Sequence, residues 1–251
     1  MQDRYAGDIG DFGKIALLQA LQSQGLTIGI NWYRVHPLAS EKQPDGSFKA
    51  QDGKYCVIPS DLQKGHEHLA AALHGMVERN ERSVDALEKE ALVPGAVYDH
   101  EWLTVANREK WHQKALDILK PVDLVFLDPD NGLLVKSVGK KSARSVKYTF
   151  YKEVKDYISR GQSVLIYNHR CRKPEEVYFR DIHENLVNCV GVQQKDILSI
   201  TFRRYTIRDY FAISACDNHR EKILNAFLSL KNSLWGEQGF CRVHKTENVS
   251  Q

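Results

Sequence analysis

Uninterrupted apolar runs, with no alternation of polar positions, mark the strands that we expect in this chain. The run Leu124–Leu127 predicts a strand buried on both faces, as in a parallel sheet covered by helices. A similar run over 162–167 follows it, after a helix-like segment from Thr149 to Arg160, at the spacing of a β-α-β unit. Residues rich in β-branched and aromatic side chains predict two upstream strands, over Leu26–Val35 and Gly95–Tyr98.

The carboxyl-terminal half ends in a predicted antiparallel hairpin. Its strands are expected over Ile197–Phe202 and Tyr210–Ala215, joined by a charged, basic connection over 203–209. The pattern as a whole predicts an α/β fold of the doubly wound, Rossmann-like kind, with a mostly parallel sheet and an antiparallel end.

Length and composition predict one domain over 1–251, with a helical segment over about 1–25 packing near the site. The longest irregular segment is expected over His36–Lys54, and a loop of that length is often functional. No stretch is apolar enough for a membrane span, and the chain does not start like a secretory signal, so we expect a cytoplasmic protein without a membrane partner. Five widely spaced cysteines without a Cys-x-x-Cys pair predict reduced, mostly buried thiols.

Two acids follow the strand at Leu124–Leu127 without a gap, in the sequence Asp128-Pro129-Asp130-Asn131-Gly132. Open α/β sheets bind their ligands beyond the carboxyl ends of the strands. Asp128, Asp130 and Asn131 are therefore the candidate catalytic residues. The alternative is a plain turn, because each residue type in this sequence favours turn geometry.

Polar residues also follow the next strand, at the same edge of the predicted sheet. The candidate substrate-binding residues are Tyr167, Asn168, His169, Arg170 and Lys173. Asn168, His169 and Arg170 offer a general base or a phosphate contact.

The net charge is only +3, but the basic residues are grouped. Clusters follow the two strands and fill the hairpin: Lys136, Lys140, Lys141, Arg144 and Lys147; Arg170, Arg172 and Lys173; Arg203, Arg204 and Arg208. The first two clusters are expected to form a basic rim beside the acids, which makes nucleic acid a candidate partner. An ordinary solvated surface is the alternative.

The segment Ala6–Lys14 is acidic and punctuated by glycines, and a helix is expected to follow over Ile15–Gln24. It is not a phosphate-binding loop of the Walker type, because five residues separate Gly7 from Gly13 and Ile15 takes the place of the Ser or Thr. Asp11 is the expected N-cap of the helix. Capping accounts for one acid of this segment and leaves Asp8 for another role.

This segment resembles the Ala-Gly-Asn-x-Ala-Asp-x-x-Lys-His motif of the bacterial large-subunit ribosomal RNA adenine-N6 methyltransferases. Leu124–Asn131 stands where that family has a strand ending in Asp-Pro-Pro-Tyr, and 197–215 matches its terminal hairpin. The resemblance implies a class I methyltransferase-like fold that binds S-adenosylmethionine. It places Asp8, Asp11 and Lys14 at the cofactor, with Lys14 neutralising the cofactor carboxylate, and has Asp128 orient a nucleophilic nitrogen.

The chain departs from this family at three places, one of which is Ile15 where the family has a His after the Lys. Asp130 and Asn131 replace the second proline and the aromatic residue that stacks on adenine, and Asn31-Trp32-Tyr33 replaces the glycine-rich loop after the first strand. Three functional classes stay open: a methyltransferase acting on nucleic acid, a magnesium-dependent phosphoester hydrolase or nuclease, and a catalytically silent methyltransferase-like binding protein. In the hydrolase, the metal ligands would be Asp8, Asp11, Asp128 and Asp130.

Overall fold

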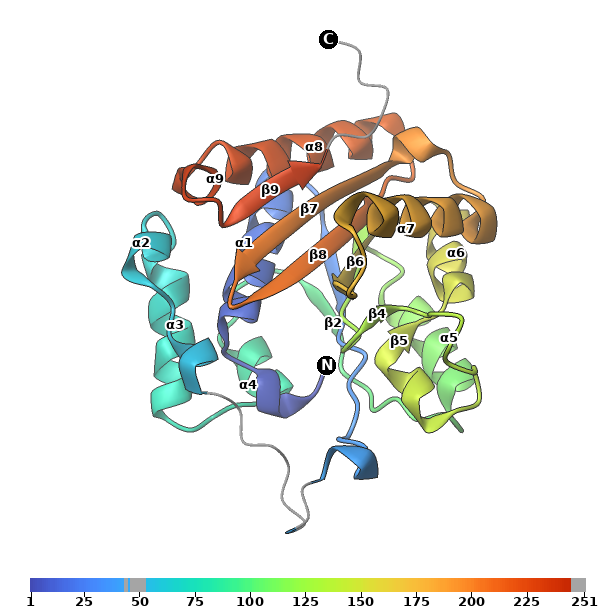
Figure 1. The fold of residues 1–251 in the computed structure, drawn as a ribbon, viewed down its shortest axis with the longest axis horizontal. Coiled ribbons are helices and arrows are strands. Elements are labelled where there is room, and N and C mark those ends of the chain that lie inside the picture. The colour runs from blue at the N-terminus through green and yellow to red at the C-terminus, as the bar shows by residue number, and fades with distance from the viewer. Residues whose placement is uncertain (43–44, 46–52, 245–251) are drawn as a thin grey trace.

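The computed structural model describes residues 1–42, 45 and 53–244, and its centre is a seven-stranded sheet in the order β2-β1-β3-β6-β8-β7-β9 (Figure 1). The parallel strands are β1 (Ile28–Asn31), β2 (Val97–Asp99), β3 (Leu124–Leu127) and β6 (Ser163–His169). The antiparallel end consists of β7 (Ile197–Arg204), β8 (Thr206–Ile213) and β9 (Cys241–His244). The prediction of a mostly parallel, Rossmann-like α/β fold with an antiparallel end is confirmed.

Helices cover both faces of this sheet. One face carries α1 (Ile9–Ser23), α3 (Glu67–Glu78), α4 (Val84–Lys89) and α8 (Asp217–Lys231). The other carries α5 (Arg108–Ile118), α6 (Tyr151–Ser159) and α7 (Glu175–Val190). Leu124 and Phe126 belong to the first apolar core and Val125 and Leu127 to the second, so β3 is buried on both faces, as its composition predicts.

Shorter elements connect this framework. They are α2 (Ser60–Gln63), α9 (Leu234–Glu237) and a separate parallel pair, β4 (Gly132–Leu133) with β5 (Tyr148–Thr149). The 3-10 turns are η1 (Asp3–Tyr5), η2 (Ala39–Glu41), η3 (Gly53–Cys56), η4 (Ala143–Lys147) and η5 (Gln194–Asp196). The predicted long loop over 36–54 falls partly on residues 43–44 and 46–52, which lie outside the described residues.

Two predicted element boundaries are wrong. The strand expected over 26–35 is limited to β1, because the backbone turns at Tyr33 with a φ of 47°. The expected basic connection over 203–209 belongs instead to β7 and β8, which leave only Tyr205 at the turn. Charge does not end a strand where basic side chains reach the protein surface, as they do at this end of the hairpin.

The start of the first helix also differs from its prediction. Helix α1 begins at Ile9 instead of Ile15, and its N-cap is Asp8, not Asp11. The Asp8 Oδ1 atom accepts hydrogen bonds from the backbone N–H groups of Gly10 at 2.6 Å and Asp11 at 3.1 Å. Gly7 precedes this cap with a φ of 81°, which turns the chain so that the helix can start early.

All five cysteines are free thiols, but three of them, Cys171, Cys189 and Cys216, are exposed, so the prediction of mostly buried thiols is wrong. They lie on loops and helix surfaces with no partner that would draw them inward. No helix within the described ranges is long and apolar enough to cross a membrane.

Candidate functional site

A buried ion pair joins helix α1 to the carboxyl end of β3. The Lys14 Nζ atom lies 2.8 Å from Asp128 Oδ2 and 2.7 Å from Asp11 Oδ1, and all three side chains are buried. Burial lowers the pKa of Lys14, but the two carboxylates outweigh it and hold that pKa above its ordinary value. Burial raises the pKa of Asp128, and Lys14 opposes that rise. The lysine therefore stays charged, and its charge partly offsets the effect of burial on the pKa of Asp128.

Asp8 and Arg208 extend this pair toward the protein surface. The Arg208 Nη2 atom, on β8, lies 3.5 Å from Asp8 Oδ2. Burial and the neighbouring charge of Asp11 raise the pKa of Asp8 to about 6, although Arg208 and Lys14 act in the opposite direction. A carboxyl group that titrates near neutral pH suits a general acid or base. We call Asp8, Asp11, Lys14, Asp128 and Arg208 the acid–lysine cluster.

Two tyrosines pack beside the acid–lysine cluster. Tyr167 on β6 and Tyr210 on β8 lie with their ring centroids 5.8 Å apart. Burial raises the pKa of both hydroxyl groups, and the charges of Lys14, Asp128 and Arg208 act on both. The hydroxyl group of Tyr210 is buried and has no hydrogen-bond partner in the described part of the chain. An unsatisfied buried hydroxyl is costly and points to a polar ligand or water at this position.

Asp130 lies in the same loop as Asp128 but has different partners. The Gln2 Nε2 atom donates to Asp130 Oδ2 at 2.6 Å, and Lys147 Nζ lies 3.3 Å from the same oxygen. Asn131 acts through its backbone, whose N–H donates to the carbonyl of Lys147 and whose carbonyl accepts from the N–H of His169. The two predicted catalytic acids are therefore close in sequence, but their side chains have different partners: Lys14 for Asp128, and Gln2 and Lys147 for Asp130.

Three backbone carbonyls converge at the carboxyl ends of β1 and β3. The amino group of Met1 donates to the carbonyl oxygens of Trp32 and Tyr33, each at 2.6 Å, and to that of Asp128 at 3.0 Å. Trp32 and Tyr33 are both buried. The end of β1 is thus a set of acceptors for a primary ammonium group.

The predicted substrate-binding residues divide into two groups. Tyr167 faces the acid–lysine cluster and His169 is exposed near it. Asn168 instead holds the fold together, because its Oδ1 accepts from the Leu133 N–H at 2.8 Å and its Nδ2 donates to the Tyr178 hydroxyl at 2.6 Å.

Arg170 and Lys173 are also committed to protein contacts. Arg170 donates to both carboxylate oxygens of the fully buried Asp209, at 2.8 and 2.6 Å, and also contacts Glu175. Lys173 lies 2.7 Å from Asp181. The roles predicted for these residues in substrate binding stay predictions, and the contacts observed are structural.

The remaining members of the basic rim face solvent. Lys136, Lys140, Lys141, Arg144 and Arg172 are exposed, and no ion pair involves them within the described residues. Lys147, which belongs to the same predicted rim, differs from these residues because it contacts Asp130 and Glu41. Sequence patterns missed Arg208, Tyr210 and Gln2 as members of the site. Only the pairing of β8 with β6, which sets Arg208 opposite His169, reveals the position of that arginine.

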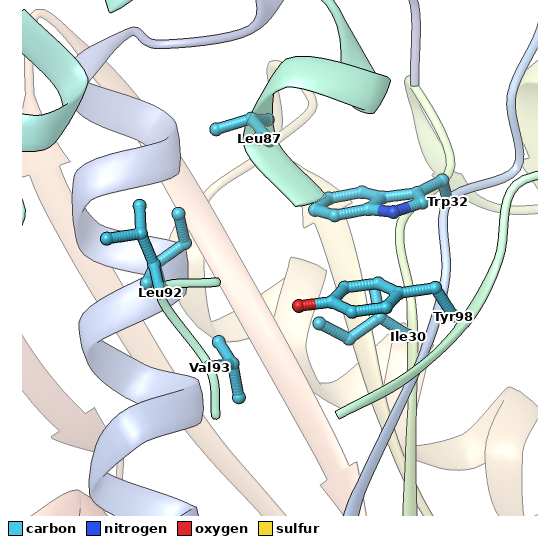
Figure 2. Close-up of a pocket in the computed structure, with 7 residues that line it drawn as sticks. Ile30, Trp32, Leu87, Leu92, Val93 and Tyr98 are labelled. Carbon is cyan, nitrogen blue, oxygen red and sulfur yellow. The ribbon is translucent and has the colours of Figure 1, made fainter. Parts of the chain in front are cut away.

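In the part of the chain that the structure describes, no group of three or more His, Cys, Asp or Glu residues is arranged to hold a metal ion. A small pocket of about 10 Å³ lies between α1, α4 and the start of the sheet, and Figure 2 shows Trp32 and Tyr98 face to face in its wall. Its lining is apolar, and it has room for little more than one water molecule.

A comparison with protein-family models and one with curated proteins found no match to this chain. The acid–lysine cluster, the paired tyrosines and the carbonyls at the end of β1 therefore define the candidate site by geometry.

Proposed function

We propose that the protein is an S-adenosylmethionine-dependent methyltransferase that acts on a nitrogen of nucleic acid at Asp128. The observation that carries this proposal is the 2.8 Å contact of Lys14 with Asp128. That contact joins the two segments on which the family resemblance rests, 6–14 and 124–131, at the carboxyl edge of a Rossmann-like sheet. The antiparallel hairpin at 197–213 adds a third match in the same order along the chain.

The hydrogen-bond acceptors at the end of β1 fit one end of the cofactor. S-adenosylmethionine carries a primary ammonium at its methionine end, and the carbonyls of Trp32, Tyr33 and Asp128 already hold such a group, that of Met1. Residues 1 and 2 fill this place, so they must move aside for a cofactor to enter. When bound, the cofactor would supply the electrophilic methyl group.

The chain's own residues would bind and orient the acceptor. The Asp128 carboxylate would accept a hydrogen bond from the acceptor amino group, and Lys14 opposes the rise that burial causes in the pKa of Asp128. Asp8, whose pKa is about 6, is suited to take up the proton that the acceptor nitrogen loses. Arg208 beside it offers a cation to an acceptor phosphate.

Isothermal titration calorimetry with S-adenosylmethionine and, separately, with magnesium chloride tests the proposal. We expect heat from the first and none from the second. We also expect transfer of a radiolabelled methyl group to a mixed pool of RNA and DNA by the wild type and by the control variant Asp181→Asn, on α7, but not by Asp128→Asn. A response to magnesium alone would select the hydrolase instead, and no response to either would select the silent binding protein.

A further inference from the structure

Two exposed tyrosines lie on segments that adjoin the candidate site. Within the described ranges, Tyr5 and Tyr205 are the only Phe, Tyr or Trp residues that are exposed, at 36% and 48% of their surface. The other aromatic side chains are buried or half-buried. An exposed aromatic ring gains little from water, so a pair of them beside a polar site is informative.

Tyr205 forms the turn of the β7–β8 hairpin, next to the start of α1 (Figure 1). Arg208, three residues further along, contacts Asp8 and so ties this turn to the acid–lysine cluster. The Tyr205 ring touches that of Tyr55 edge-on, with centroids 5.7 Å apart, and the preceding Arg204 pairs with Asp61 at 3.0 Å. The turn is therefore held in place while the Tyr205 ring stays accessible.

The backbone of Tyr205 is in the left-handed region, with a φ of 59°. A bulky side chain is disfavoured there, at a cost of order 1 kcal/mol or more, whereas glycine adopts it freely. The turn itself does not require a tyrosine. Strain of this kind in a turn that is tied to a candidate site points to a function of the side chain.

Tyr5, the other exposed tyrosine, lies at the end of η1. The Arg4 guanidinium is 4.8 Å from the centre of the Tyr5 ring. Burial raises the pKa of Tyr5, and the charges of Asp130 and Lys147 also act on it, which places its ring at the Asp130 side of the site. Each exposed tyrosine thus has an arginine as its neighbour in sequence, Arg4 for Tyr5 and Arg204 for Tyr205.

We propose that Tyr205 and Tyr5 stack on unpaired bases of a single-stranded nucleic acid. This inference rests on the proposed function and names its substrate class. Exposed rings next to cations are the common means of holding single strands, because every base has a face to stack and every nucleotide a phosphate. The two tyrosines would supply the aromatic platform that Asp130 and Asn131 do not provide in the loop after β3. A duplex would not offer these faces, since its bases are already stacked.

The test measures fluorescence anisotropy of a labelled short single strand, and of the same strand with abasic sites, without any cofactor. We expect Tyr205→Gly to weaken binding of the intact strand by roughly 5- to 150-fold, the range of one lost base–aromatic stack. Binding of the abasic strand should not change. Tyr205→Phe should keep the affinity, as should Leu234→Ala, a control for another exposed apolar side chain, on α9.

Thermal unfolding of Tyr205→Gly separates this role from a structural one. Relief of the left-handed strain should leave the melting temperature of this variant unchanged or raise it. A lower melting temperature, or an equal loss of affinity for the abasic strand, would overturn the stacking role. Base-dependent binding without any heat from S-adenosylmethionine would contradict the proposed function but not this inference. Heat from the cofactor, with equal affinity of wild type and Tyr205→Gly for the intact strand, would contradict this inference but not the proposed function.

Discussion

Lys14 and Asp128 are 114 residues apart in the chain, yet Lys14 Nζ donates a hydrogen bond to Asp128 Oδ2 over 2.8 Å in the protein interior. The same ammonium group contacts Asp11, so one buried cation faces two carboxylates. Charges removed from water need such partners, because the attraction must offset the loss of hydration. The pair therefore ties helix α1 to the edge of the sheet and places a fixed charge at the candidate site.

Replacing Lys14 by methionine should destabilise the protein by about 3–5 kcal/mol at neutral pH, because a buried carboxylate loses its cation. The deficit should shrink as the pH falls. Asp128 already has a raised pKa in the folded protein, and without Lys14 that pKa rises further, so the acid can be protonated and neutral at mildly acidic pH. Urea unfolding at several pH values measures both effects.

Lys152→Met is the matched control for this change. Lys152 is exposed and pairs with Asp156 at 2.8 Å on the surface of α6, so its loss should cost less than about 0.5 kcal/mol. Equal destabilisation by the two variants would contradict a compensating role for Lys14.

Asp8 should make the stability of the wild type depend on pH. Its pKa is raised from 3.8 to about 6 on folding, so the folded state binds the proton more tightly than the unfolded chain. This stabilisation is fully present below about pH 4 and is lost as the pH rises through about 6, a change of up to about 3 kcal/mol. Asn also caps helices well, so Asp8→Asn should fold. Its free energy of unfolding should lack the pH-dependent contribution of Asp8.

The difference between wild type and Asp8→Asn isolates Asp8 from other groups that titrate in this range. Asp99 is one of them, since burial raises its pKa to about 6 as well. Unfolding free energies measured across the acidic range should diverge between the two proteins toward neutral pH, with the variant the more stable. Parallel curves would show that Asp8 is not held in an unfavourable environment.

How far these features follow from the sequence depends on how local their causes are. Strand β3 was predicted, with Asp128 directly after its carboxyl end, because Leu124–Leu127 is apolar at every position and needs no distant information. The start of α1 was not, since Asp8 and Asp11 are both suitable caps and the turn at Gly7 decides between them. The three errors at element ends concern backbone turns that involve Tyr33, Tyr205 or Gly7, where the side-chain pattern carries little signal.

The sequence predicts which segments form the site, but not which side chains interact with one another there. The acids after β3 and the segment 6–14 were predicted to lie near one another, and Lys14 and Asp128 do. Arg170 looks like a ligand from its position after a strand, but its partner Asp209 lies 39 residues away and only the pairing of β6 with β8 brings them together. Long-range pairing of this kind is set by the three-dimensional register, which a single sequence does not display.

Gly132 should tolerate no side chain. Its φ is 112°, and a Cβ atom there would lie 1.9 Å from the Oδ1 atom of Asn168. Asn168 cannot move without losing its bond to the Leu133 N–H, so Gly132→Ala should destabilise the protein by more than about 2 kcal/mol. Gly139→Ala is the control, because no atom lies within 4 Å of its Cβ position, and it should change stability by less than about 0.5 kcal/mol. Thermal unfolding measures both effects. Equal melting temperatures of the two variants would contradict the close approach of Asn168 to Gly132.

Exposed lysines of the basic rim should set the salt dependence of nucleic-acid binding. Lys140 and Lys141 are exposed, so a phosphate could reach them. If they contact a backbone, Lys140→Gln with Lys141→Gln should reduce the slope of log affinity against log salt by roughly 1 to 2 units, since each released contact contributes about 0.7 on single strands and 0.9 on duplexes. Sequence preference should not change, because phosphate contacts do not read bases.

Arg170 provides the contrast, because its loss should act on stability instead. Arg170→Gln would leave the fully buried Asp209 without its cation, at a cost of about 3–5 kcal/mol, so any weaker binding would follow from unfolding. Filter binding of a mixed RNA and DNA pool at several salt concentrations, combined with urea unfolding of each variant, distinguishes the two effects. A slope that stays unchanged in the double lysine variant would make this part of the rim an ordinary solvated surface, and it would leave Arg208 and the exposed tyrosines as the contacts for nucleic acid.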